Sequence, residues 1–183
     1  LDAGTRPAKT DQEDSAIDQP ALHKDWAALQ DTHDFVLLLK KHNVGRLQAL
    51  RLAGNAFAVP CPKDALTKAF EQAKATGLSI MVFVGNDGCV QIHTGPVNNL
   101  KVMGPWFNVL DPTFNLHLRD DLIDSVWLVR KPTVDGIVTS LEAYAADNSL
   151  ILQMFGERKP GIEELTDWRN LAESLAAPKG AAA

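Results

Sequence analysis

Residues 80–93 read Ile-Met-Val-Phe-Val-Gly-Asn-Asp-Gly-Cys-Val-Gln-Ile-His. Two short runs, Ile80–Val84 and Cys89–His93, are rich in β-branched and other apolar residues, and the four residues between them are Gly, Asn, Asp and Gly. These four favour a turn, because they tolerate the backbone angles that tight turns require. The stretch therefore predicts two strands in a hairpin, and such short connections imply antiparallel pairing.

The same alternation of strand-like runs and turn residues continues toward the C-terminus. Asp-Pro, Asp-Gly and Asp-Asn pairs mark several of the turns. The further strands that we expect are Leu100–Met103, Trp106–Leu110, Phe114–Leu118, Ser125–Arg130, Ile137–Tyr144 and Leu150–Phe155. A last helix is expected over Ile162–Leu175.

Upstream of residue 80 the apolar spacing is mostly helical. We expect one helix to open at Pro20, a second to begin near Asp31 as its N-cap, and a third to run from Pro62 to Gly77. Between the second and third, apolar residues alternate around Gly54-Asn55, which predicts another hairpin over residues 50–59.

These elements predict an α+β fold with N-terminal helices, a large antiparallel meandering sheet and a closing C-terminal helix. Residues 20–176 are expected to form one domain. Residues 1–19 are polar and are expected to be a disordered linker, and residues 177–183 a disordered tail.

Composition narrows the class of protein. The chain has 183 residues, 45% of them hydrophobic, and a formal net charge of −5, which argues against nucleic acid as its main partner. It has no apolar run of the ~20 residues that a membrane helix needs.

Cys61 and Cys89 lack metal-site spacing and are expected to be reduced, which favours a cytoplasmic location. The chain begins at Leu1 without a signal-peptide pattern, so we expect it to be part of a longer one.

Among the five histidines, His33 has a distinctive position. No pair has the HxxxH or HxH spacing that a closed zinc site would favour. If Asp31 is the N-cap, His33 lies in the first helical turn, where the helix dipole disfavours a protonated imidazole. A neutral imidazole can bind iron, although a surface histidine without a ligand is the simpler alternative.

Four further polar residues lie near the predicted ends of elements: Arg46, Lys131, Gln153 and Arg158. Basic residues at strand ends are usually solvated, and by themselves these four form no motif.

Several strings taken together resemble one known family. They are Trp26–Phe35 (WAALQDTHDF), Arg46–Ala53 (RLQALRLA), Gln91–Val97 (QIHTGPV), Lys101–Pro112 (KVMGPWFNVLDP), Phe114–Arg119 (FNLHLR), Val129–Thr133 (VRKPT) and Phe155–Gly161 (FGERKPG). In this order, and over nearly all of the expected domain, they resemble the bacterial haem-utilisation (hemin transport and degrading) family of the HmuS/HemS/ChuS type.

The resemblance implies a particular arrangement. Members of that family have about twice this length and consist of two similar halves, and Arg158–Gly161 with the helix that follows resembles the C-terminal half. Haem lies between the halves, and the matching string makes His33 its iron ligand. Contacts to the haem edges and propionates map onto Arg46, Lys131, Gln153 and Arg158. The family's distal arginine comes from the N-terminal half, which this chain does not contain.

The resemblance leaves the activity open. The first hypothesis is a cytoplasmic haem-binding domain for haem trafficking and iron acquisition. The alternative is a haem-degrading enzyme that cleaves the macrocycle with oxygen, and a second alternative is a regulatory module that binds DNA or protein. Expected partners are haem, a haem oxygenase, the missing N-terminal half, or a second copy in a homodimer.

Overall fold

The computed structural model describes residues 11–86 and 88–176. Within these residues the helices are η1 (Asp14–Ala16), α1 (Gln19–Ala27), α2 (Asp34–Lys41), α3 (Arg46–Leu52), α4 (Ala65–Thr76), η2 (Asp120–Leu122) and α5 (Thr166–Ser174). The strands are β1 (Ala58–Cys61), β2 (Ile80–Gly85), β3 (Val90–Gly95), β4 (Leu100–Met103), β5 (Trp106–Asp111), β6 (Phe114–Arg119), β7 (Ser125–Thr133), β8 (Gly136–Tyr144) and β9 (Leu150–Gly156).

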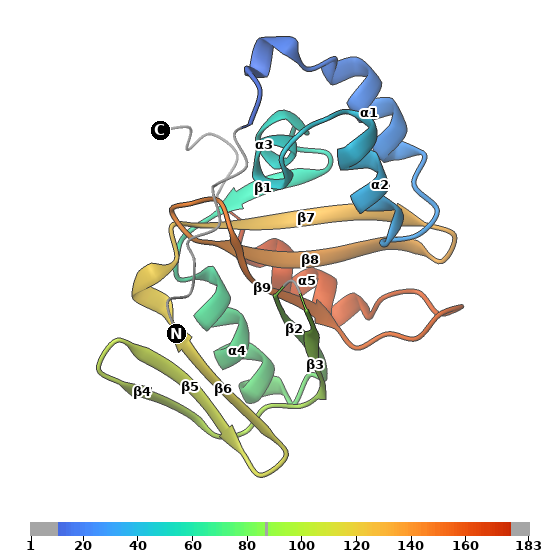
Figure 1. Cartoon of the computed structure of the whole chain (residues 1–183). Helices are drawn as coiled ribbons and strands as arrows, with labels where there is room; N and C mark the ends of the chain where they lie inside the picture. The colour runs from blue at the N-terminus through green and yellow to red at the C-terminus, as the bar shows by residue number, and fades with distance from the viewer. Residues whose placement is uncertain (1–10, 87, 177–183) are drawn as a thin grey trace.

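The strands form two antiparallel sheets (Figure 1). A six-stranded sheet has the order β1-β7-β8-β9-β2-β3, and a three-stranded sheet has the order β4-β5-β6. The α+β class, the antiparallel sheet and the closing helix are confirmed, although the strands divide between two sheets. The chain leaves the larger sheet after β3, where the Asp111 carboxylate accepts the backbone N–H groups of Asn98 and Asn99.

Helices cover both faces of the larger sheet (Figure 1). On one face, α1, α2 and α3 pack over β1 and β7 around Trp26, whose indole N–H donates to the carbonyl of Arg130. On the other face, α4 lies between the two sheets, and Phe70 contacts Phe107 of β5 with ring centroids 5.5 Å apart. In the part of the chain that the structure describes, no helix combines the length and apolar character needed to cross a membrane.

The hairpin expected around Gly54-Asn55 is wrong in its first arm. Residues 46–52 form α3, because Leu47 and Leu50 are three residues apart and both bury against the same core. Gly54 then takes a left-handed conformation with φ of +70°, and only β1 follows as a strand.

Three helices begin later than expected, and one of them is α4, which begins at Ala65 instead of Pro62. Helix α2 begins at Asp34 with His33 as its N-cap residue, because the Asp31 carboxylate accepts the backbone N–H of His33 in a turn before the helix. Helix α5 begins at Thr166 instead of Ile162. The preceding Glu164 accepts hydrogen bonds from the backbone and hydroxyl of Thr139, which holds this segment against β8.

The polar N-terminal segment also differs from the expected linker. Ile17 is buried in the core beneath α1–α3, and Gln12 donates to the carbonyl of Asn43 at 2.7 Å. Packing therefore extends well upstream of Pro20. The parts of the linker and tail predictions that fall on residues 1–10 and 177–183 lie outside the described residues.

Candidate functional site

Three of the predicted site residues meet around one carboxylate that the sequence prediction did not include. Glu142 lies on β8 and is fully buried. Arg46 approaches it from the first turn of α3, with Nη2 2.8 Å from Oε1 and Nε 3.0 Å from Oε2. Lys131 approaches from β7, with Nζ 2.7 Å from Oε1. The arrangement is a buried cluster of two cations and one anion.

Neutral donors complete the coordination of Glu142. Gln153, its register partner on β9, donates from Nε2 to Oε1 at 2.9 Å. Ser140 and Tyr144 lie two residues to either side on β8, and alternation along a strand places both on the same face as Glu142. The Ser140 hydroxyl donates to Oε1 at 3.1 Å, and the Tyr144 hydroxyl donates to Oε2.

The electrostatics of the cluster follow from burial and pairing. Burial alone would raise the pKa of Glu142, but the charges of Arg46 and Lys131 hold it well below its ordinary value. Burial lowers the pKa of Lys131, which Glu142 only partly offsets. Burial and the adjacent Glu142 charge raise the pKa of Tyr144 well above its usual range. With both cations charged, the cluster carries one excess positive charge.

Phe35 connects this cluster to the predicted iron ligand. The guanidinium carbon of Arg46 lies 5.1 Å from the centroid of the Phe35 ring, and Nζ of Lys131 lies 4.8 Å from it. Both distances are within the range of cation–π attraction. Phe35 stands on α2 two residues after His33, so the N-terminus of α2 adjoins the cations.

His33 is strongly exposed and its imidazole is held from one side. Its side chain is 93% exposed, and Nδ1 lies 2.6 Å from Oδ1 of Asp31. The hydrogen bonds from the His33 backbone and side chain lower the pKa of Asp31, and the Asp31 carboxylate is the group that pairs with Nδ1. Nε2 makes no hydrogen bond to a described residue, and in the neutral tautomer with the proton on Nδ1 this nitrogen can bind a metal.

Apolar side chains share the helix surface with His33. Val36 and Leu37 follow it at the three- and four-residue spacing that places side chains on one face of a helix. Val36 is 49% exposed and Leu37 is 62% exposed. An imidazole with a free nitrogen thus adjoins an exposed apolar stripe, His33–Val36–Leu37.

A hollow adjoins the cluster through Gln153. It has a volume of about 720 Å³ and is lined by Phe83, Gly85, Asn86, Val90, Ser149, Leu150, Ile151 and Gln153. Phe83 is the register partner of Gln153, so both lie on the sheet face that carries Glu142. On the same face, Ile92 opposite Phe83 is 55% exposed. The face is therefore apolar and open beside the cluster.

Arg158 lies apart from the other predicted contacts. Its Nη2 is 3.5 Å from Oδ2 of Asp135 in the turn between β7 and β8. Its charge also contributes to the lowered pKa of Asp31, after the hydrogen bonds from His33. The buried Nε of Arg158 has no hydrogen-bond partner among the described residues. The structure therefore places Arg158 on the Asp31 side of the site and not on Glu142.

Other histidines are engaged differently. Nε2 of His42 is 2.6 Å from the Asp25 carboxylate, and Nε2 of His23 is 2.6 Å from the carbonyl of Leu52. The His93 ring stacks on Phe114 with centroids 3.9 Å apart. Within residues 11–86 and 88–176, no cluster of three His, Cys, Asp or Glu side chains could hold a metal ion.

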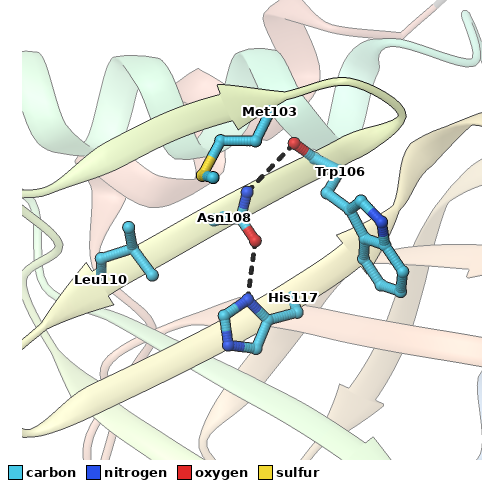
Figure 2. A pocket seen from close by; sticks show the side chains of 5 residues that line it. All are labelled: Met103, Trp106, Asn108, Leu110 and His117. Atoms are coloured by element: carbon cyan, nitrogen blue, oxygen red, sulfur yellow. Dashed lines mark hydrogen bonds between the residues drawn. The ribbon is translucent and has the colours of Figure 1, made fainter.

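A second hollow of about 460 Å³ lies on the outer face of the three-stranded sheet (Figure 2). Asn108 donates to the carbonyls of Lys101 and Trp106, so its oxygen is left to accept from Nδ1 of His117 at 2.7 Å. Met103 and Leu110 also line this hollow. It shares no lining residue with the hollow beside Gln153.

The sequence prediction missed Glu142, Phe35 and Asp31 as site residues. One signal for Glu142 was available, because it is a lone charge within an otherwise apolar and neutral strand run, between Leu141 and Ala143. A charged residue at such a position is almost never buried unless it is paired. Its partners come from three other elements, and no local pattern identifies them.

Comparison with known proteins places this geometry in a family. Residues 43–175 match the family described as the haemin-degrading HemS.ChuX domain, a range that includes Arg46, Lys131, Gln153 and Arg158 but not His33. Hemin transport protein HemS of Yersinia enterocolitica is 42% identical over 166 residues, which are 91% of this chain and 46% of that protein.

Two solved structures have the same fold. PhuS, described as a heme-binding protein from Pseudomonas aeruginosa, has 57% identity and a TM-score of 0.91, over 94% of this chain and 50% of its own. ChuS, described as an E. coli heme oxygenase, has 44% identity and a TM-score of 0.85, over 87% of this chain and 49% of its own. The chain thus spans about half the length of these relatives. It belongs to the haemin-degrading HemS.ChuX domain family.

Proposed function

We propose that this chain is a cytoplasmic haem-binding domain that serves haem trafficking and iron acquisition, with His33 as the iron ligand. The observation that carries the proposal is the surroundings of the His33 imidazole. Asp31 pairs with Nδ1, Nε2 makes no hydrogen bond to a described residue, and the exposed Val36 and Leu37 lie on the same helix face. A haem site needs such a ligand, an apolar wall and cations for two propionates.

The cluster around Glu142 supports the requirement for cations. It holds one excess positive charge beside an apolar hollow, and Arg46 keeps 23% of its side chain exposed. We propose that Arg46 and Gln153 contact a haem carboxylate directly. Lys131 is only 3% exposed, so in this conformation it acts from behind them through its charge. Arg158 is proposed to contact the haem edge from the side of Asp31.

The relatives support haem as the ligand, since PhuS is described as heme-binding and HemS as a hemin transport protein. Because the chain spans about half of each, the activity of the longer proteins is a proposal for this one. The second half of a longer chain, or a second copy, is expected to cover the exposed face of α2. A haem oxygenase is a candidate recipient of the haem.

A haem-degrading role is the second candidate, and the description of ChuS as a heme oxygenase favours it. When bound, haem supplies the iron centre at which oxygen chemistry takes place. The residues of this chain would then orient the ring through Arg46 and Gln153 and hold the imidazole through Asp31. Incubation of the haem complex with ascorbate and catalase under air separates the roles: a carrier keeps its Soret band, and an enzyme loses it to a defined tetrapyrrole product.

Substitution of His33 tests the central assignment. We expect His33→Ala to abolish or strongly shift the ferric Soret band, because the free Nε2 is lost. His117→Ala is the matched control, since His117 is also exposed but lies on the outer face of the small sheet. An unchanged spectrum in His33→Ala, or an equal loss in His117→Ala, would contradict the proposal.

Substitution of Leu37 tests the apolar wall. Full burial of a leucine contributes about 1.5–3 kcal/mol, and Leu37 is 62% exposed. Covering it with porphyrin is therefore worth about 1–2 kcal/mol, so Leu37→Ser should weaken haem binding roughly 5- to 30-fold. Leu122→Ser is the control, as an exposed leucine on η2. If Leu37→Ser and Leu122→Ser bind haem with equal affinity, Leu37 is not part of the haem site.

A further inference from the structure

The Glu142 carboxylate accepts more hydrogen bonds than its geometry favours. Six N–H or O–H groups point to it, four of them to Oε1 alone. An ionised carboxylate offers about four lone-pair sites in all. Oε1 is thus crowded by donors from Arg46, Lys131, Ser140 and Gln153, while the side chain itself has no exposure to solvent.

The donors that crowd this carboxylate have capacity left over. Nη1 of Arg46 makes no hydrogen bond to any described residue, and Lys131 uses Nζ for Glu142 alone. Nε of Arg46 also donates to the Tyr144 hydroxyl at 3.0 Å, and both cations lie over the face of the Phe35 ring. Gln153 is half-buried and also lines the adjoining hollow. Groups that share one buried acceptor can therefore turn part of their hydrogen bonding toward a second one on the side of the hollow.

We propose that Glu142 is a positioning residue that acts as an internal counter-ion. Without ligand, its carboxylate accepts the hydrogen bonds of Arg46, Lys131 and Gln153. When a ligand carboxylate binds, part of these hydrogen bonds are transferred to the ligand. The inference rests on the proposed function, because the ligand is taken to be a porphyrin with carboxylate side chains. Glu142 itself does not touch the ligand, and it sets the charge and geometry of the residues that do.

The charge balance predicts the direction in which each substitution should change the binding of a ligand carboxylate. Two cations and one anion leave one positive charge, which one ligand carboxylate neutralises. Glu142→Gln raises the excess to two positive charges and frees donors. Lys131→Met lowers the excess to zero with a side chain of similar length. Tyr144→Phe leaves the charge unchanged and removes a hydroxyl that donates to Oε2 of Glu142 and accepts from Nε of Arg46.

The test compares two metal-free probes, protoporphyrin IX and its dimethyl ester, which share the ring but differ in their carboxylates. Binding to the full chain is followed by porphyrin fluorescence, and folding of each variant by circular dichroism. The readout is the preference for the acid over the ester, because a general loss of structure lowers both affinities together. Iron ligation by His33 does not enter, since neither probe contains iron.

The expected preferences differ in direction among the variants. Glu142→Gln should raise the acid-over-ester preference about tenfold and Lys131→Met should lower it about tenfold, as expected for a unit charge near a partly solvated carboxylate. Tyr144→Phe keeps the charge of the cluster and should change this preference much less than either of the charge-changing substitutions. If the wild type binds the acid but Glu142→Gln fails to raise the preference, or Lys131→Met fails to lower it, the role of Glu142 is refuted alone. If the wild type binds neither probe, the role of Glu142 is also refuted, and binding of ferric haem by the wild type then decides the proposed function separately. Should Glu142→Gln not fold, Lys131→Met and Tyr144→Phe still decide the result.

Discussion

A double-mutant cycle with Glu142→Gln and Lys131→Met measures the coupling free energy between these two side chains of the buried cluster. The two side chains have exposures of 0% and 3%, with Nζ 2.7 Å from Oε1. Glu142→Gln alone leaves two cations buried without their counter-ion, and such a loss typically costs about 3–5 kcal/mol in the free energy of unfolding. Lys131→Met should cost less, about 1–3 kcal/mol, because Arg46 still neutralises Glu142.

The double variant should be more stable than the sum of these losses predicts. Coulomb's law at 2.7 Å, with an effective dielectric constant of ~20, gives an attraction of about 6 kcal/mol. Side chains relax in each single variant, so the measured coupling is expected to be smaller, about 2–4 kcal/mol. Removing the second partner spares the cost of leaving the first one buried and unpaired.

Urea denaturation of the four proteins provides the measurement, with equal m values as the condition for comparing them. The pair Lys63–Asp124 serves as the control, because its nitrogen and oxygen are 3.2 Å apart but its side chains are 65% and 56% exposed. Such an exposed pair should show a coupling of about 0–1 kcal/mol. Additivity within about 0.5 kcal/mol at Glu142 and Lys131 would refute the view that the cluster acts as a unit.

Three other predictions concern stability and reactivity. Burial would raise the pKa of Glu142, but the charges of Arg46 and Lys131 outweigh burial and hold this pKa well below its ordinary value. The contribution of Glu142 to stability is therefore complete above about pH 4.5 and is lost as the pH falls through the folded-state pKa. In an acid titration followed by circular dichroism, Glu142→Gln should lose less stability than the wild type. Gly156→Ala should destabilise the fold by about 1–3 kcal/mol in thermal unfolding, because its new Cβ would lie 2.5 Å from Cβ of Trp168, and no change would mean that α5 shifts freely. Burial raises the pKa of the Cys61 thiol to about 11, so iodoacetamide at pH 8 should modify the exposed Cys89 first, and equal rates would contradict this.

The fold was predictable wherever one local pattern dominated. The turn between Ile80–Val84 and Cys89–His93 specifies its hairpin by residue type alone, and β2 and β3 flank it in the structure. The segment 46–52 was ambiguous because Leu50 and Leu52 alternate like a strand while Leu47 and Leu50 repeat like a helix. Burial against Trp26 and its neighbours resolved this choice, and it is a tertiary effect. The same holds for Glu164, which delays α5 by binding a residue 25 positions away.

The site was predictable only in part, for a related reason. The resemblance named Arg46, Lys131 and Gln153, and the structure brings these three together, but it does so through Glu142. The sequence separations to Glu142 are 96 and 11 residues for Arg46 and Lys131, so neither spacing nor periodicity connects them. What could be inferred locally was limited to one helix end, where Asp31 and His33 are two residues apart.

The two parts of the proposed site differ in how much order they have before a ligand arrives. The side chains around Glu142 are already fixed by hydrogen bonds, so a carboxylate that binds there immobilises little that is free. His33 is 93% exposed and its ring pairs with Asp31, so in the proposed function iron ligation would be completed at a solvated helix end. In the proposed function, carboxylate recognition would use preorganised side chains of the interior, whereas the bond to iron would depend on the surface that covers Val36 and Leu37. On this reasoning the ease of haem release is controlled at α2, and substitutions there should change dissociation rates more than substitutions around Glu142 do.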